Sequence, residues 1–130
     1  MSDFTHFNLD DVKDQAPGFG LDDFQEARFA NEDSDADQIG FGLQRIKPNQ
    51  RPPFAHRHDD AEEMYVILSG SGRMKLDDEI IDVVRLDAIR VAPGVTRAWE
   101  AGPEGLELLA FGARHEGDGE VVQGWWTETE

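Results

Sequence analysis

Short stretches of alternating side chains run through most of this chain, and clusters of turn-forming residues separate them. Over residues 39–45 a period of two is clear: Ile39, Phe41, Leu43 and Arg45 alternate with Gly40, Gly42 and Gln44. Such alternation is typical of a β-strand with small residues on one face. Comparable patterns predict further strands at 24–30, 54–58, 62–68, 73–76, 80–86, 88–92, 97–100 and 106–112.

Polar, Gly-rich or Pro-rich segments predict the turns. They lie at 31–37, 47–53, 59–60, 69–72, 77–79, 93–94 and 101–105. The only helical candidate is weak, residues 9–13, with Asn8 as its N-cap. Many short strands with regularly spaced turns and no long amphipathic helix predict an all-β sandwich or barrel.

The 130 residues suit one domain with its own hydrophobic core. We expect an N-terminal extension at 1–23, a barrel at about 24–114 and a C-terminal tail at 115–130. Trp125 and Trp126 bring two large apolar rings into this acidic tail. We expect them to dock on the barrel or on a second subunit, which would hold a terminus that otherwise frays.

Composition narrows the chemistry. Without cysteine, disulfides, thiolate catalysis and Cys-based metal sites are excluded, so a metal would need His, carboxylate or amide ligands. The net charge of −16 disfavours binding to nucleic acid or to an anionic membrane. The sequence shows no secretory signal and no apolar run of the ~20 residues that cross a bilayer. We therefore expect a cytoplasmic protein.

Two histidines and a glutamate form the strongest candidate site. His56 and His58 are one residue apart, so a strand would place both imidazoles on one face. Glu63 lies on the next predicted strand and shares its face with Tyr65, whereas Glu62 belongs to the opposite face. If the turn at 59–60 folds the chain back, His56, His58 and Glu63 converge as ligands for a divalent first-row metal.

The segment 56–70 resembles the first motif of the cupin family: His-x-His, three or four residues, Glu, six residues, Gly. Four residues separate His58 from Glu63 here, and six separate Glu63 from Gly70. The segment 87–99 is similar to the second cupin motif. The resemblance covers roughly residues 39–112 and implies a double-stranded β-helix, the cupin jelly-roll barrel. It also implies a homodimer and a metal site at His56, His58 and Glu63 holding Fe, Mn, Ni or Zn.

The second motif departs from the family pattern at three positions. Leu86 stands where a glycine is usual, Ala92 where a proline is common, and Arg97 where the family has its last histidine ligand. A guanidinium is always charged and cannot bind a metal. At 4 Å and an effective dielectric near 20, two unit charges interact by about 4 kcal/mol, and a dication doubles this repulsion.

Three placements of Arg97 remain open at this point. Its side chain could point at the carboxylate or phosphate of a substrate beside a three-ligand metal site. It could instead form a salt bridge with Glu63 across the barrel, with no metal held. Or it could lean out of the barrel mouth into solvent. Arg97 and Tyr65 are the candidate substrate-binding residues, although a tyrosine in this position is more often part of the core.

Two functions follow from these residues. The first is a metal-dependent enzyme acting on a small molecule, of the dioxygenase, isomerase or decarboxylase type found among cupins. The second is a non-catalytic, metal-free module that binds a small anionic metabolite through Arg97 and the histidines.

Overall fold

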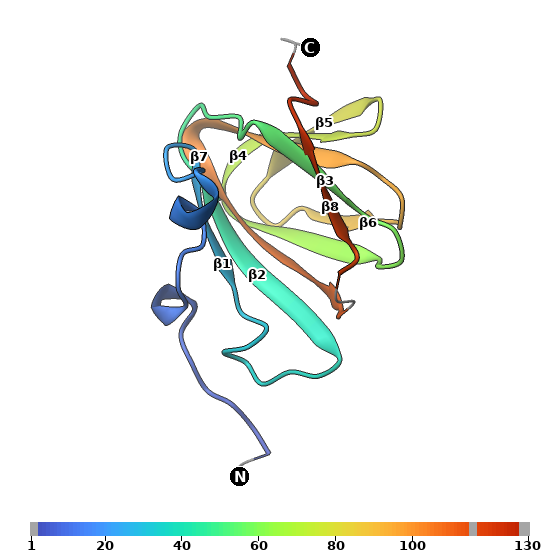
Figure 1. Cartoon of the computed structure of the whole chain (residues 1–130). Coiled ribbons are helices and arrows are strands. Elements are labelled where there is room, and N and C mark those ends of the chain that lie inside the picture. Colours follow the sequence, from blue (N-terminus) through green and yellow to red (C-terminus); the bar gives the residue numbers. More distant parts are fainter. Residues whose placement is uncertain (1–2, 115–116, 128–130) are drawn as a thin grey trace.

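The computed structural model describes residues 3–114 and 117–127 (Figure 1). It is all-β, as the alternation predicts, and its antiparallel sheet curls into a half-open barrel. Two short 3-10 turns come first, η1 (Leu9–Asp11) and η2 (Pro17–Phe19). The strands that follow are β1 (Gln25–Phe29), β2 (Ile39–Ile46), β3 (Phe54–His58), β4 (Glu63–Leu76), β5 (Glu79–Val84), β6 (Ala88–Val91), β7 (Arg97–Ala113) and β8 (Gly119–Gln123).

The sheet is organised around its two longest strands, β4 and β7. They pair along nearly their whole lengths, from Glu63↔Gly112 to Leu76↔Arg97. On the other edge of β7 lie β2, at its C-terminal half, and β3, through His56↔Arg97. The strand order β1-β2-β7-β3-β8 therefore places β1 and β2 across the curl from β3 and β8 (Figure 1).

Turns predicted at 69–72 and 101–105 are wrong, because β4 and β7 run straight through these segments. The glycines there permit a close approach of the two strands. A Cβ on Gly70, whose φ is +78°, would lie 2.0 Å from the carbonyl oxygen of Gly105, and one on Gly72 would lie 2.1 Å from that of Glu100. The glycines at these positions therefore mark β-bulges and close contact between the two backbones, and not a turn.

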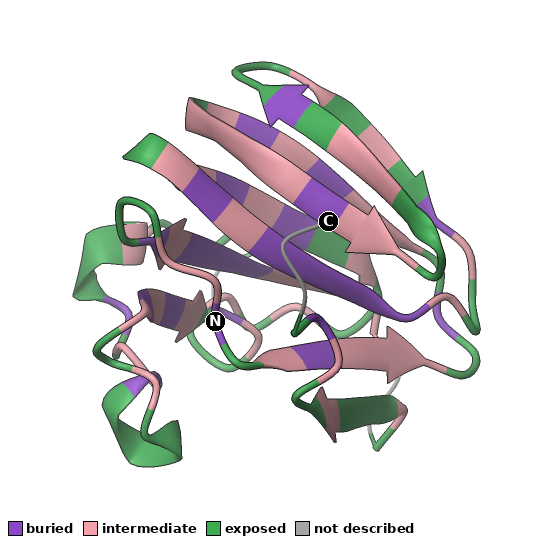
Figure 2. Ribbon diagram, turned by 90° about the horizontal axis from the view of Figure 1, so that it is seen from above, coloured by how far each residue is buried: buried purple, intermediate pink, exposed green. Residues whose placement is uncertain are grey.

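The core lies between the strands, on the faces that alternation assigns to it. Tyr65 and Ile67 on β4 are fully buried, which puts Glu63 on the inner face with them. Figure 2 shows buried and more exposed residues alternating along the strands, while the short 3-10 turns are exposed. The main buried cluster comprises Ile46, Tyr65, Ile67, Met74, Val83, Val91, Trp99, Ala101, Leu106, Leu108 and Ala110.

Both terminal segments contact the sheet. The weak helical candidate at 9–13 is only the 3-10 turn η1, although Asn8 does cap it by accepting the N–H of Asp10 at 2.8 Å. At the other end, Trp126 is buried and lies under the Arg51 guanidinium, 4.3 Å from the ring centre. Trp126 therefore docks on the barrel of its own chain.

Within the predicted tail, 119–123 form the unexpected strand β8, while 115, 116 and 128–130 lie outside the described residues. None of the described helices has the length and apolar character needed to span a bilayer.

The turn between β5 and β6 contains a local conflict between sequence and backbone. Leu86 has a φ of +73° and a side chain that is 64% exposed, at the position where the cupin resemblance expects glycine. A left-handed backbone costs a non-glycine residue roughly 1–2 kcal/mol. Little buried surface offsets this cost.

We predict that Leu86→Gly raises the free energy of unfolding by about 1 kcal/mol, because glycine adopts positive φ freely. Val84→Gly is a matched control, since Val84 is 55% exposed on β5 and has no positive φ. It should lower stability by about 1 kcal/mol. Urea denaturation of the three proteins measures both changes. Equal losses in the two variants would contradict strain at Leu86.

Candidate metal and ligand site

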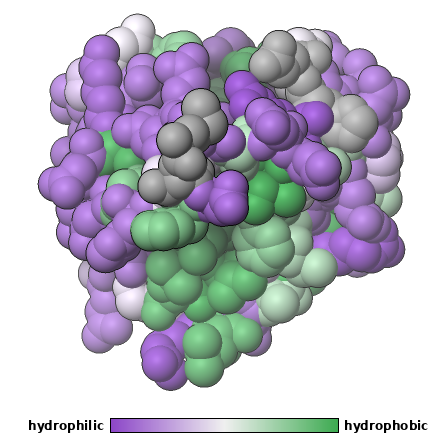
Figure 3. All heavy atoms as spheres, turned by 90° about the horizontal axis from the view of Figure 1, so that it is seen from below, coloured by the Kyte–Doolittle hydropathy of each residue, from purple (hydrophilic) through white to green (hydrophobic). Residues whose placement is uncertain are grey.

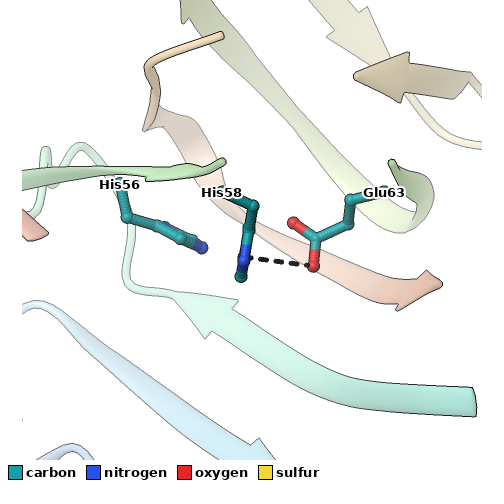
Figure 4. A group of neighbouring side chains, drawn as sticks. All are labelled: His56, His58 and Glu63. Carbon is teal, nitrogen blue, oxygen red and sulfur yellow. Dashed lines mark ion pairs between the residues drawn. The ribbon is translucent and has the colours of Figure 1, made fainter. Parts of the chain in front are cut away.

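Two neighbouring strands bring the predicted ligands together. His56 and His58 lie on the same face of β3, and Glu63 begins β4 after the turn at 59–62. One potential ligand atom from each of the three lies within 4.8 Å of the others. Figure 4 shows His58 beside His56 and facing Glu63, with 3.8 Å between His58 Nε2 and Glu63 Oε2. Strand alternation and the turn thus create the convergence that the sequence predicts.

The two oxygens of Glu63 have different environments. Oε1 accepts hydrogen bonds from the Tyr65 hydroxyl and, at 2.7 Å, from Arg97 Nη2. Oε2 faces His58. One oxygen therefore anchors the carboxylate to the protein, while the other is directed toward the imidazoles.

Arg97 is 1% exposed, so it does not lean into solvent. Its guanidinium makes the salt bridge to Glu63 that was one of the three open placements. Nε donates to the Tyr65 hydroxyl at 3.0 Å, and Nη1 donates to the carbonyl oxygen of Val95 at 3.0 Å. Neither Arg97 nor Tyr65 is among the residues that line the adjoining cavity. For either one to touch a bound molecule, this network would have to open.

Burial and the Arg97 charge set the protonation of the site. Burial, reinforced by Arg97, lowers the pKa of His56 to about 4, so its imidazole is neutral at pH 7. Burial opposes ionisation of Glu63, but hydrogen bonds from Tyr65 and Arg97 hold its pKa below the usual value. Burial also raises the pKa of Tyr65, which keeps its hydroxyl protonated. The site thus combines a neutral imidazole, which can donate a lone pair, with a charged carboxylate.

Asp118, just before β8, is a residue that the sequence reasoning missed. It accepts the backbone N–H groups of Asp59, Asp60 and Ala61, at 2.9, 2.8 and 2.9 Å, and so holds the turn between β3 and β4. Its Oδ2 also lies 3.6 Å from Nδ1 of His58, a buried atom with no hydrogen-bond partner among the described residues. These N–H groups lower the pKa of Asp118, although burial opposes this. No local sequence pattern connects position 118 with position 58.

A cavity of about 430 Å³ adjoins the three ligands, within the range of small-molecule pockets. Its walls come from β1, β2, β3, β7, β8 and the segment around η2, and most of them are apolar. Phe19, Phe29 and Val121 line it and are also exposed. Figure 3 shows apolar side chains gathered on one face of the molecule and surrounded by hydrophilic ones.

Comparisons with known proteins agree with this architecture. The family model described as "Cupin domain" matches residues 42–112. A cupin protein from Bacteroides fragilis is similar in structure, with a TM-score of 0.71, 19% identity and coverage of 90% of this chain and 89% of that one. The polyketide cyclase RemF from Streptomyces resistomycificus gives a TM-score of 0.73 at 20% identity, covering 95% and 87%.

Oxalate decarboxylase from Bacillus subtilis also gives a TM-score of 0.73, at 21% identity. The match covers 95% of this chain but only 33% of the decarboxylase, so this chain spans about a third of that protein. Among curated proteins none matches the sequence. At these identities the structural matches establish the fold.

The low pKa of His56 predicts a specific loss of stability in acid. An unfolded histidine takes up a proton near pH 6.5, whereas folded His56 does so only at about pH 4. This contribution to stability is therefore complete above about pH 6.5 and lost as the pH falls to about 4. Urea denaturation in EDTA should show native protein losing about 2–3 kcal/mol more than His56→Gln between about pH 7 and 4.5.

His6→Gln is the matched control, because His6 is exposed. It should retain the native pH dependence. An identical pH dependence in His56→Gln and native protein would show that His56 titrates normally.

Proposed function

The chain belongs to the cupin domain family, and from this premise we propose that it is a metal-dependent enzyme acting on a small organic molecule. In this proposal His56, His58 and Glu63 bind one divalent transition metal, of the group Fe, Mn, Ni and Zn. The supporting observation is that their ligand atoms lie within 4.8 Å of one another beside a cavity of about 430 Å³. A bound metal would supply Lewis acidity or an oxygen-activating centre.

The chemistry of the donor set fits such a metal. Two imidazoles and one carboxylate leave coordination positions open, as in the facial sets of first-row metal enzymes. Neutral His56 requires no deprotonation at pH 7. Glu63 is ionised, and its Oε2 is the oxygen that faces His58. The donor set can therefore form without breaking the Arg97 salt bridge.

Arg97 and Tyr65 act as positioning residues in this proposal. By binding Oε1 of Glu63 they fix the carboxylate and orient its other oxygen toward the histidines. Hydrogen-bonded partners of this kind usually contribute to the affinity of a metal site. Arg97 also lowers metal affinity, because its positive charge lies just beyond the Glu63 carboxylate and repels the metal ion. We therefore expect weaker metal binding than a site with histidine at position 97 would provide.

A second candidate is a metal-free module that binds a small molecule. The observation that favours it is the 2.7 Å ion pair, which already satisfies Glu63 with a buried cation. If the pair fully neutralises Glu63, the histidines alone would bind metal weakly. Binding of a small molecule in the cavity, for example an anionic metabolite, would then be the remaining function.

Metal analysis separates the two candidates. Protein purified without a His-tag and incubated with each of the four metals should retain about one equivalent after gel filtration. His56→Ala should lose this metal, because only one imidazole remains, whereas His6→Ala should keep it. If native protein carries no metal under any of these conditions, the enzyme proposal fails and the metal-free module takes its place.

Asp118 provides a second prediction. Asp118→Asn removes the negative charge that faces His58 Nδ1 but can retain an oxygen acceptor for the turn. We expect metal affinity to fall by roughly 10-fold to 100-fold, as for other residues that orient a ligating histidine. Competition with a chromogenic chelator measures the affinity, and thermal unfolding in EDTA reports the structural effect.

The matched control for this variant is Asp14→Asn. Asp14 also accepts two backbone N–H groups, those of Ala16 and Ala27, but is not among the residues that line the cavity. It should lower the unfolding temperature without changing metal affinity. Equal metal affinities in Asp118→Asn and native protein would remove Asp118 from the site.

A further inference from the structure

Two glutamines form a polar region in the otherwise apolar wall of the cavity. Gln25 on β1 and Gln44 on β2 both line it. The register pairs Ala27 with Gln44 and Gln25 with Ile46, so the glutamines are diagonal neighbours on the same face of the sheet. The two side-chain amides therefore face the same region of the cavity from adjacent strands.

Both glutamines are almost completely buried, with 3% exposure for Gln25 and 9% for Gln44. No hydrogen bond joins either side-chain amide to another described residue, and neither amide is among the fully enclosed polar atoms that lack a partner, so both amides open onto the cavity. Leucine or methionine would continue the apolar wall at these two positions, so the amides add polar groups that face the cavity. The arrangement is explained if the amides bond to a molecule inside the cavity.

The rest of the lining defines the body of that molecule. The wall carries aromatic and aliphatic side chains, chiefly Phe19, Leu21, Phe29, Phe41, Phe54 and Val121. Flat or bulky apolar surface is what such a wall binds best. Its volume of about 430 Å³ suits a molecule larger than a simple carboxylic acid.

Charge argues against an anionic group at the glutamines. The charged side chains that line the cavity are two carboxylates, Glu62 and Glu63, and one guanidinium, Arg114, which donates to the carbonyl oxygen of Ala36. Arg97, the buried cation nearest the histidines, is held outside the lining by Glu63 and Tyr65. With a net charge of −16 on the chain as well, an anion would enter an unfavourable field.

We propose that Gln25 and Gln44 select an uncharged, largely apolar molecule, such as a fused aromatic compound, by binding a hydroxyl or carbonyl group on it. An amide pair supplies both donors and acceptors, which suits these two groups. The other end of the molecule lies toward His56, His58 and Glu63. If that end is also the one that reacts, this part of the proposal rests on the proposed function, whereas the selection by the glutamines does not.

The sheet register gives the scale of the molecule. Glu63 on β4 and Gly40 on β2 both pair with Gly112 of β7, so Glu63 and Gly40 lie at the same height in the sheet. Gln44 lies four residues further along β2. Four residues of strand span about 13 Å, and the side chains at both ends shorten the gap. A body of about two or three fused rings would therefore reach from the amides to the imidazoles.

Three probes of one shape test the selection: naphthalene, 2-naphthol and 2-naphthoate. Fluorescence titration of the metal-free full chain measures each dissociation constant. We expect 2-naphthol to bind about tenfold more tightly than naphthalene, because it adds hydrogen bonds to the amides, and more tightly than 2-naphthoate. Equal binding of 2-naphthol and naphthalene, tightest binding of 2-naphthoate, or no binding of any probe would overturn the proposal.

Gln44→Met and Gln25→Met locate the selection. Each should reduce 2-naphthol affinity to nearly that of naphthalene, while naphthalene affinity stays the same or rises. Gln123→Met is the matched control, because Gln123 lines the same cavity but is exposed. A native preference for 2-naphthol in either inner variant would count against the assignment.

Metal titration of the same proteins keeps the two proposals distinct. Gln25→Met and Gln44→Met should bind metal as native protein does, and His56→Ala should keep its preference for 2-naphthol. A metal-free chain that still prefers 2-naphthol would leave the glutamine proposal standing while the enzyme proposal fails. A metal-binding chain without that preference would give the opposite result.

Discussion

The buried ion pair between Arg97 and Glu63 is the interaction on which the site depends. A guanidinium with 1% exposure needs a counter-charge and acceptors for its N–H groups, and Glu63, Tyr65 and the Val95 carbonyl provide them. Removing either partner would leave an uncompensated buried charge, which typically costs about 3–5 kcal/mol. The pair also joins β4 to β7 at the point where β3 pairs with Arg97 through His56.

This interaction divides one carboxylate between two tasks. Oε1 of Glu63 belongs to the network with Arg97 and Tyr65, so it holds the fold together. Oε2 faces His58 beside the cavity, so it remains available for chemistry. The same Arg97 charge helps keep His56 neutral, which prepares it to donate a lone pair. A residue that cannot bind metal can therefore still shape a site for one, and this is why an arginine at position 97 does not by itself remove the donor set.

Local patterns predicted the parts of this site that depend on neighbouring residues. Alternation allowed only one of Glu62 and Glu63 to face the histidines, and the spacing in the cupin resemblance identified Glu63. Side-chain direction on a strand follows from the backbone period, so such inferences need only a few residues of sequence. The barrel class followed in the same way from the succession of short alternating segments.

The sequence could not supply what depends on distant contacts. Arg97 had three open placements, since it pairs in register with His56 and Leu76, and only the curl of the sheet brings Glu63 and Tyr65 to its side chain. Asp118 is 60 residues from His58 along the chain and reaches it because β8 pairs with β3, a strand that the acidic tail did not predict. The glycines at 70 and 72 predict a turn, but they lie inside β4, because a turn and a close approach of two strands favour the same residue.

Unpartnered polar groups connect the two ends of the cavity. His58 Nδ1 is a buried atom without a hydrogen-bond partner among the described residues. The amides of Gln25 and Gln44 open onto the same cavity, which all three residues line. By contrast, the buried guanidinium of Arg97 uses each of its three nitrogens in a hydrogen bond to the protein. Polar groups that have no protein partner remain available to a molecule in the cavity, and hydrogen bonds to them would add to its affinity. The imidazoles and the two amides are therefore polar contacts that an otherwise apolar cavity offers to such a molecule.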